Sequence, residues 1–183
     1  MNRSVINSQK FSPKRLALLC MFAFPALLYG QYKGNDNCLV SFRNYPNSSG
    51  RLEHAVEDVS FSFRPGTYAW DVTVTNHSED DIVIDWSNAQ FLINGMASGL
   101  VCRPVGATRY DGPPKATLIG RGMTFNGSLS PSILSNERRP EKIYDSKMLS
   151  KNNKRLIVIV IPTSHRGGPR HYNNFDFLIE SGK

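Results

Sequence analysis

The chain has 183 residues, of which 22 are basic and 15 acidic, so its formal net charge is +7. Four of the basic residues and none of the acidic ones lie in the first 30 positions, which leaves 18 basic and 15 acidic residues and a net charge of +3 for residues 31–183. So small an excess does not indicate nucleic acid as a partner. The remaining length suits one domain with an adequate core.

The first 30 residues have the three parts of a secretory signal peptide. Basic residues precede an apolar run from Leu16 to Leu28, and the small residue Gly30 follows it. The run is shorter than the ~20 residues that a bilayer span needs. We therefore predict that residues 1–30 are cleaved and that the protein is secreted or lies in the periplasm or cell envelope, with no membrane span after cleavage. A lipoprotein modified at Cys20 and an uncleaved anchor are the alternatives, although Leu19 before the cysteine and Pro25 inside the run argue against them.

Removal of Cys20 with the signal leaves Cys38 and Cys102 in the mature chain. Two cysteines in an exported protein can form a disulfide, and a loop of this length would gain on the order of 4 kcal/mol. We predict a Cys38–Cys102 bridge. Two separate, partly buried thiols are the alternative.

Residues 31–55 are polar and rich in turn residues apart from 38–42, and we treat them as a polar N-terminal segment before a domain spanning 56–183. Val59, Phe61 and Phe63 then alternate with polar residues, which is the period of a half-buried strand. Similar short runs predict strands at 59–64, 68–75, 82–86, 91–93, 97–103, 117–119, 123–129, 156–161 and 172–179.

Particular residues refine this pattern. Asn94-Gly95 predicts a type I′ hairpin, because both central residues of that turn need positive φ. The apolar run 156–161 predicts a central strand covered on both faces, ended by Pro162. With turn signals between the strands and no long amphipathic helix, the sequence predicts an all-β fold. An antiparallel immunoglobulin-like β-sandwich of about 7–9 short strands is favoured, and a barrel is the alternative.

The strand that ends at Asn76, the polar turn after it, and the segments 82–86 and 91–95 together resemble a group of uncharacterised bacterial secreted or envelope proteins with an immunoglobulin-like β-sandwich. The ending LIVIVIP, a glycine-containing loop and YNNFDFLI are similar to the last hairpin of that group. The strand–Asn–turn–strand element also resembles the sandwich domain of late-embryogenesis-abundant and water-stress proteins. The resemblance implies a fold and an extracytoplasmic address, and it carries over no catalytic residue.

No motif for catalysis or cofactor binding is present: there is no G-x-S-x-G, phosphate loop or dinucleotide fingerprint. His165 and His171 flank a loop and would approach each other in a hairpin, but among arginines they are better interpreted as solvated side chains than as metal ligands. The acidic run Glu79-Asp80-Asp81 is interpreted as an exposed turn rather than a hydrolytic or calcium site. The sequence therefore predicts no catalytic, cofactor-binding or metal residues, no cofactor, and no enzyme.

Two groups of side chains are candidates for binding. The aromatic residues of the first strands would form either the core, which alternation favours, or a ligand platform; they are Phe61, Phe63, Tyr68, Trp70 and Trp86. The basic residues of the C-terminal third would bind an anionic surface or form a solvated insertion; they are Arg138, Arg139, Lys142, Lys147, Lys151, Lys154, Arg155, Arg166 and Arg170. Asn47, Asn76 and Asn126 match the N-glycosylation pattern.

Three hypotheses for function follow. The leading one is an exported non-enzymatic domain that acts by protein or envelope-surface contacts. The second is a binding module for an anionic polymer or glycan that uses the basic C-terminal segment. The third is an enzyme with an unrecognised site.

Overall fold

The computed structural model describes residues 31–34, 37–45, 50–106, 115–135, 139–150 and 153–182. Strand pairs in this part of the chain are antiparallel, and the helical elements are short 3₁₀ turns. The prediction of an all-β, antiparallel fold is therefore confirmed. The signal peptide predicted for residues 1–30 lies outside the described residues.

Hydrogen bonds join twelve strands of the described chain into one sheet. In chain order the elements are β1 (Tyr32–Lys33), β2 (Cys38–Phe42), β3 (Leu52–Val56), β4 (Val59–Arg64), β5 (Trp70–Asn76), β6 (Ile82–Asp85), η3 (Trp86–Asn88), β7 (Gln90–Ile93), β8 (Met96–Pro104), β9 (Ala116–Ile119), β10 (Thr124–Pro131), η4 (Ser132–Leu134), β11 (Arg155–His165) and β12 (Arg170–Ser181). The sheet order is β1-β2-β12-β11-β7-β8-β10-β5-β4-β3, with β6 paired to β11 and β9 paired to β6.

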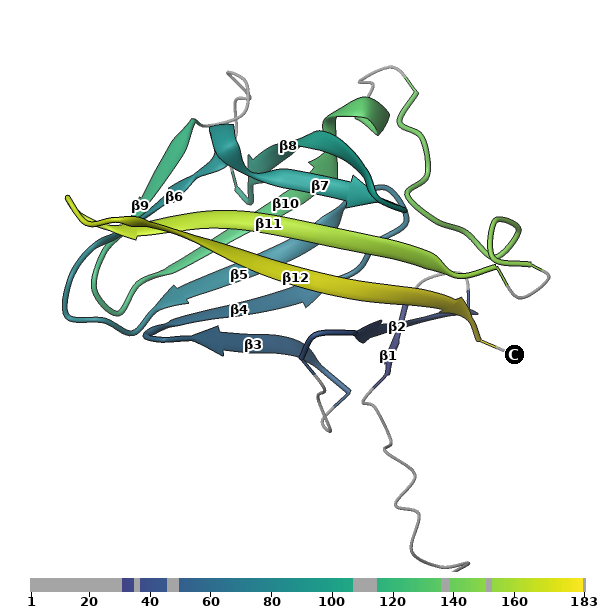
Figure 1. The fold of residues 1–183 in the computed structure, drawn as a ribbon, viewed down its shortest axis with the longest axis horizontal. Coiled ribbons are helices and arrows are strands. Elements are labelled where there is room, and N and C mark those ends of the chain that lie inside the picture. The colour runs from purple at the N-terminus through teal and green to yellow at the C-terminus, as the bar shows by residue number, and fades with distance from the viewer. Residues whose placement is uncertain are drawn as a thin grey trace, which may run out of the picture.

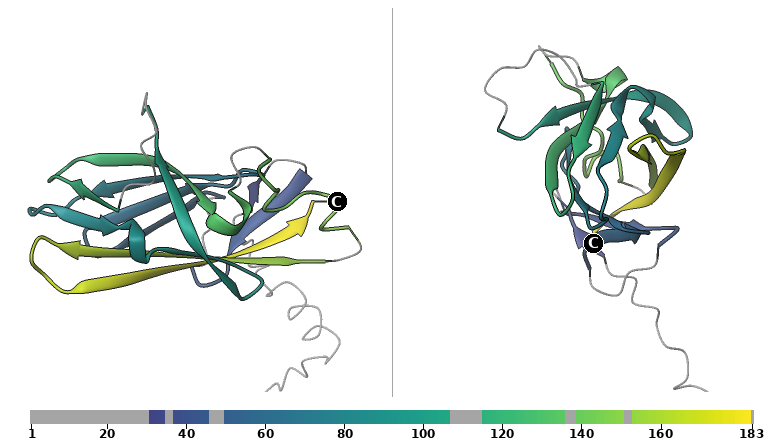
Figure 2. Two further views of the ribbon diagram at one scale, coloured as in Figure 1. Left: turned by 90° about the horizontal axis from the view of Figure 1, so that it is seen from above. Right: turned by 90° about the vertical axis from the view of Figure 1, so that its left-hand side faces the viewer.

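The sheet curls into two layers that enclose the core (Figures 1 and 2). The first layer contains β1, β2, β12, β11, β7, β6 and β9, and the second contains β10, β5, β4 and β3. Strand β8 belongs to both, because its residues 96–99 pair with β7 and its residues 100–104 pair with β10. The predicted immunoglobulin-like sandwich of fewer strands is therefore wrong in detail: the strands form a nearly closed, barrel-like sheet.

Two strands lie in the segment that the sequence presents as polar. Strand β2 alternates buried Cys38, Val40 and Phe42 with partly exposed residues and pairs with β12. Strand β3 pairs with β4, but only its Leu52 is fully buried. A strand with one buried side chain has no clear period of two, which explains why the sequence pattern did not show it.

Pro162 does not end β11, which continues to His165. On one side, residues 157–160 of β11 pair with β7 and residues 163–165 pair with β6. Between those two ladders lies the 3₁₀ turn η3, so Pro162 faces a gap where no ladder bond is available. Its missing N–H therefore costs nothing on that side, and the prediction that Pro162 stops the strand is wrong.

Side chains rather than backbone bonds close the opposite side of the barrel, between β2 and β3. Tyr45, just after β2, stacks on His54 of β3 with ring centroids 3.4 Å apart and an interplanar angle of 16°. The edge of the His54 ring also faces Phe175, at 6.5 Å. Burial lowers the pKa of His54, because an imidazolium would be desolvated there.

This lowered pKa predicts a pH-dependent stability. The unfolded chain binds a proton at His54 near the ordinary pKa of about 6.5, and the folded chain binds it only at lower pH. The stabilisation is therefore complete above about pH 6.5 and is lost as the pH falls toward the lowered folded pKa. Urea midpoints measured between pH 8 and pH 5 should fall less for His54→Phe than for the natural protein. A full wild-type decline in His54→Phe would contradict this assignment, and His171→Gln, at an exposed histidine, is the control.

Aromatic rings from both layers meet in the core. Phe177 of β12 contacts Phe42, Phe63 and Trp70, with centroid distances of 4.7, 5.2 and 4.8 Å. Phe61, Phe63, Trp70 and Trp86 are at most 3% exposed, so the prediction that they belong to the core is confirmed. It is wrong for Tyr68, which precedes β5 and is 48% exposed.

The predicted Cys38–Cys102 disulfide is absent. Both cysteines are fully buried and unbridged, Cys38 at the start of β2 beside Ser181 and Cys102 in β8 beside Leu129. Burial raises the pKa of the Cys102 thiol to about 12, which keeps it protonated and unreactive at neutral pH.

A thiol titration tests this arrangement. Protein produced from residue 31 onward, and therefore without Cys20, should release two reactive thiols when it is unfolded in denaturant without reductant. The folded protein should react slowly at Cys102, because the thiolate fraction is small and the site is closed. No thiols after unfolding would contradict the structure, and Cys102→Ser, with one thiol fewer, is the control for site assignment.

Candidate interaction surface

Strand β11 is apolar on both of its sides. Ile157, Ile159 and Ile161 point inward and are fully buried. Leu156, Val158 and Val160 alternate with them, point outward and stay partly exposed. The prediction that this strand is covered on both faces is therefore wrong, because within the described chain each side of the core has a single layer of strands and no helix lies over it.

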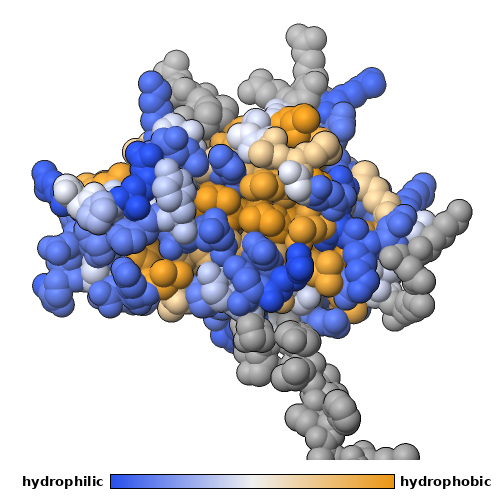
Figure 3. Space-filling model, viewed as in Figure 1, coloured by the Kyte–Doolittle hydropathy of each residue, from blue (hydrophilic) through white to orange (hydrophobic). Residues whose placement is uncertain are grey.

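Neighbouring strands extend this outer surface. Leu92 of β7 lies opposite Val158, Ala97 of β8 lies opposite Leu92, and Leu178 of β12 lies opposite Leu156. We name as the apolar face the outward residues Leu92, Ala97, Leu156, Val158, Val160, Tyr172 and Leu178. In the space-filling view, an apolar patch surrounded by polar residues covers the middle of β7 and β11 (Figure 3). On the outward side of β12, the polar residues Asn174 and Asp176 lie between Tyr172 and Leu178.

The outer surface of the second layer has a different character. Ser60 lies beside Thr75, and Ser62 lies beside Thr73, across β4 and β5. The Thr73 hydroxyl donates to the Asn126 side chain at 2.8 Å, and the hydroxyls of Thr75 and Thr124 are 3.0 Å apart. This surface is hydroxyl-rich, so the contiguous outward apolar surface belongs to the first layer alone.

Ion pairs border the apolar face at both ends. Arg170, at the start of β12, contacts Asp85 at 2.7 Å, and Lys154, just before β11, contacts Glu180 at 2.6 Å. Hydrogen bonds from Ser87 and Asn88 are the main reason why the pKa of Asp85 is lowered. Each border therefore has one basic and one acidic group, and neither end has a strong net charge.

The structure separates the basic residues into two groups. Lys142, Lys147, Lys154 and Arg155 lie near the start of β11, while Arg166 and Arg170 lie at the β11–β12 hairpin. Strand β11, which lies between them, has 11 residues and is about 36 Å long at about 3.3 Å per residue. Arg139 precedes Pro140, which borders the η4 turn. Arg138 and Lys151 lie outside the described residues.

Several of these cations already have partners. Lys142 contacts Asp145 at 3.3 Å. The Arg155 guanidinium donates to the Met148 sulfur at 3.0 Å, and burial lowers its pKa. A continuous basic surface across both groups is therefore not formed.

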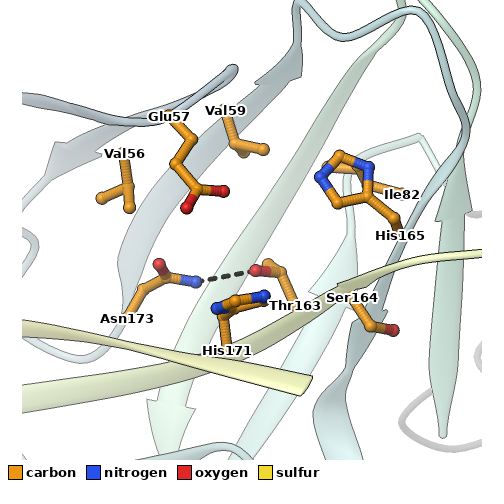
Figure 4. A pocket seen from close by; sticks show the side chains of 9 residues that line it. All are labelled: Val56, Glu57, Val59, Ile82, Thr163, Ser164, His165, His171 and Asn173. Carbon is orange, nitrogen blue, oxygen red and sulfur yellow. Dashed lines mark hydrogen bonds between the residues drawn. The ribbon is translucent and has the colours of Figure 1, made fainter. Parts of the chain in front are cut away.

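His165 and His171 line a small cavity with Glu57, Thr163 and Asn173 (Figure 4). The Asn173 amide donates to the Thr163 hydroxyl and the Ile161 carbonyl, both at 2.9 Å. The cavity volume is about 30 Å³, which is enough for one or two water molecules. Nδ1 of His165 is buried there without a protein partner, so such water would satisfy it.

Within the described ranges, no group of three or more histidine, cysteine or acidic side chains has a geometry that could hold a metal ion. In the acidic turn, Glu79 is paired with Arg121. The Asp80 carbonyl accepts a hydrogen bond from the Asn76 amide at 2.8 Å. These contacts organise the turn itself.

Asn76 is a structural residue that the sequence presented only as the end of a strand and as a match to the N-glycosylation pattern. Its amide also donates to the Ile119 carbonyl at 3.0 Å, and its Oδ1 accepts from the Ser78 N–H at 2.9 Å. The side chain is fully buried, so it cannot serve as a glycan acceptor in the folded protein. Asn126, which also matches the N-glycosylation pattern, is exposed, and Asn47 lies outside the described residues.

A separate cleft of about 210 Å³ lies on the second layer, where η4 and Pro140 border it. The Tyr68 ring, the Arg103 side chain and the hydroxyls of Ser128 and Ser130 line it. Ser128 is flanked by Arg103 on β8 and Asp71 on β5. Sequence patterns did not single out this cleft because Tyr68 and Arg103 are 35 positions apart and only the pairing of β8, β10 and β5 brings them together.

No known protein family matches the chain, and no curated protein matches it. A search of solved structures finds the X-ray structure of Northeast Structural Genomics Consortium target SoR45, with a TM-score of 0.29 and 8% sequence identity over 80% of this chain and 88% of that one. In the described part of the chain, no helix is both long enough and apolar enough to span a membrane.

Proposed function

We propose that this chain is an exported, non-catalytic binding domain that acts by protein contacts through its apolar face. The observation that carries the proposal is the outward side of β11, where Leu156, Val158 and Val160 follow one another, with Leu92 of β7 opposite Val158 and Leu178 of β12 opposite Leu156. Contiguous exposed apolar surface is uncommon on monomeric proteins and is typical of interaction sites.

The chemistry of the face favours a folded partner over a bound peptide. Its residues belong to neighbouring strands of one layer and line neither the cleft at Tyr68 nor the cavity at His165. A surface without a groove is complementary to another flat surface, such as a second sheet. At each border the basic group is already paired with an acidic group of the same chain. A strongly acidic or strongly basic partner therefore gains little electrostatic attraction there.

The extracytoplasmic address is part of the same proposal. The first 30 residues have the composition of a signal peptide, and the chain resembles envelope proteins in its strand–turn–strand segments. We propose the bacterial envelope or its exterior as the place where the apolar face meets its partner.

Site-specific photo-crosslinking in the native envelope tests the proposal. A photoreactive amino acid at position 158 lies on the apolar face, and one at position 62 lies on the hydroxyl-rich surface of the second layer. Position 158 should give discrete protein adducts that mass spectrometry identifies, and these should disappear when Leu92→Lys is added. Equal adduct patterns at positions 158 and 62 would reject the apolar face as the working surface.

The cleft at Tyr68 supports a second candidate function, binding of an acidic sugar. An arginine pairs well with a carboxylate, an aromatic ring packs on a sugar face, and serine hydroxyls bond to sugar hydroxyls; Arg103, Tyr68, Ser128 and Ser130 supply these groups. Titration of the mature protein with glucuronate and with glucose, followed by NMR, should shift cleft resonances only with glucuronate. No shift, or equal shifts with both sugars, would remove this candidate, and Arg103→Ala is the matched variant.

A further inference from the structure

We propose that the partner seated on the apolar face is a second copy of this chain, related by a two-fold axis that lies between the copies and crosses the strands at the level of Ile159 and Phe175. This inference rests on the proposed function and names its partner. Ile159 and Phe175 are paired across β11 and β12, near the middle of their ladder. In this arrangement β12 lies over the partner's β12, and β11 over the partner's β11, with the strands antiparallel.

A two-fold interface must be self-complementary, since each residue meets its counterpart from the other copy. The outward residues of β12 meet this condition about Phe175. Asn174 and Asp176 lie one position away on either side, and three positions away lie Tyr172 and Leu178, which both have large apolar side chains. Tyr172 therefore packs on the partner's Leu178, and Asn174 lies beside the partner's Asp176, where an amide can donate to a carboxylate.

The outward residues of β11 show the same symmetry about Ile159. Val158 and Val160 are equally distant from it on either side. In the dimer Val158 packs on the partner's Val160. This contact is apolar on both sides, as is typical of the core of an interface.

Charge at the ends of β12 follows the opposite-sign rule. Arg170 and Glu180 are equally distant from Phe175 and lie on the same outer side of the strand. Arg170 therefore faces the partner's Glu180, and the reciprocal pair forms at the other end. Within each copy, Asp85 is paired with Arg170 and Lys154 is paired with Glu180. Each end of the interface therefore holds four charges of alternating sign: Asp85 and Arg170 of one copy, and the partner's Glu180 and the partner's Lys154.

The size of the face fits a modest dimer. Ten residue pairs of the β11–β12 ladder span about 33 Å, and four strands span about 19 Å. The footprint is on the order of 600 Å² per copy, somewhat below the roughly 800 Å² of a standard stable interface. We therefore expect dissociation in the micromolar range.

Analytical ultracentrifugation of the mature protein from 1 to 200 μM tests the inference. The natural protein should sediment as a dimer at the upper concentrations. Val158→Lys, which places two lysines in the apolar contact, should weaken association at least 100-fold, while Ser62→Lys on the second layer should leave it unchanged. Circular dichroism and thermal unfolding should show that both variants stay folded, because both positions point outward.

A short thiol-specific cross-linker tests the register. Mixed Arg170→Cys and Glu180→Cys chains should form a cross-linked heterodimer, whereas Arg170→Cys alone should not cross-link to itself, because its two copies lie at opposite ends of the interface. A monomer at 200 μM, a dimer unaffected by Val158→Lys, or self-linking of Arg170→Cys as efficient as the mixed reaction would each overturn the inference. If the dimer is absent but photo-crosslinking from position 158 gives discrete adducts to a different protein, the proposed function stands and only the dimer inference fails. The failure of the dimer inference can therefore be told apart from the failure of the proposed function.

Discussion

Phe177→Ala is expected to lower the free energy of unfolding by about 3–5 kcal/mol, the range for aromatic truncation in a packed core. Phe177 is fully buried and lies where both layers meet, against Phe42, Phe63 and Trp70. Removing the ring takes away its apolar burial and leaves a cavity between layers that are fixed by their ladders and cannot collapse to fill it. Urea unfolding followed by tryptophan fluorescence measures the change directly, because Trp70 is one of the contacts.

Tyr172→Ala is the matched control for this substitution. Tyr172 lies on the same strand but points outward and is 56% exposed. Its replacement should change the stability of the monomer by less than about 1 kcal/mol. If Phe177→Ala cost no more than Tyr172→Ala, the packing of β12 against the second layer would be refuted. The comparison should be made at low micromolar concentration or below, where association contributes little to the measured stability.

Much of the strand pattern was predictable because it depends on local chemistry. Alternation at Val59, Phe61 and Phe63 predicted β4, and the structure places these residues inward. Asn94 and Gly95 have φ values of 50° and 82°, and Ile93 pairs with Met96 across the two-residue loop, as the predicted type I′ hairpin requires. These features depend on a few neighbouring residues, which a sequence displays directly.

The features that were missed depend on partners that are distant in the chain. Pro162 is accommodated only because η3 interrupts the neighbouring strand, which no local rule at Pro162 can reveal. Closure of the barrel through β8 depends on β8 pairing with β7 at one end and with β10 at the other. Likewise, proximity of the basic residues in sequence did not translate into proximity in space, because β11 carries Arg155 and Arg166 to opposite ends of the molecule.

The candidate site shows the same limit in another form. The apolar run 156–161 correctly indicated a strand with apolar residues on both sides. It did not indicate whether the second side would be covered by this chain or by another molecule. The hydrophobic effect favours removing apolar surface from water, but it does not specify which surface provides the cover. The symmetric spacing of Arg170 and Glu180 acquires meaning only once the ladder register is known.

Asn76→Ala is expected to cost about 2–4 kcal/mol although it removes only a small polar side chain. The Asn76 amide nitrogen donates hydrogen bonds to the carbonyls of Asp80 and Ile119, and Asn76 Oδ1 accepts one from the N–H of Ser78. The bond to Ile119 links the end of β5 in the second layer to β9 in the first. Alanine leaves these buried backbone groups without their partner, and a buried unpaired group costs far more than an average hydrogen bond contributes.

Asn126→Ala separates this effect from the general loss of an asparagine. Asn126 is exposed on β10 and accepts a hydrogen bond from Thr73, so water can replace its side chain at a cost below about 1 kcal/mol. Asn76→Asp retains an acceptor for Ser78 but loses both amide donors and buries a carboxylate, so it should be at least as destabilising as alanine. Equal stability of the Asn76 and Asn126 variants in urea would show that the turn after β5 does not depend on this network. A greater loss at Asn76 would mean that one side chain ties the two layers together at this end, where the described backbone forms no ladder between β5 and β9.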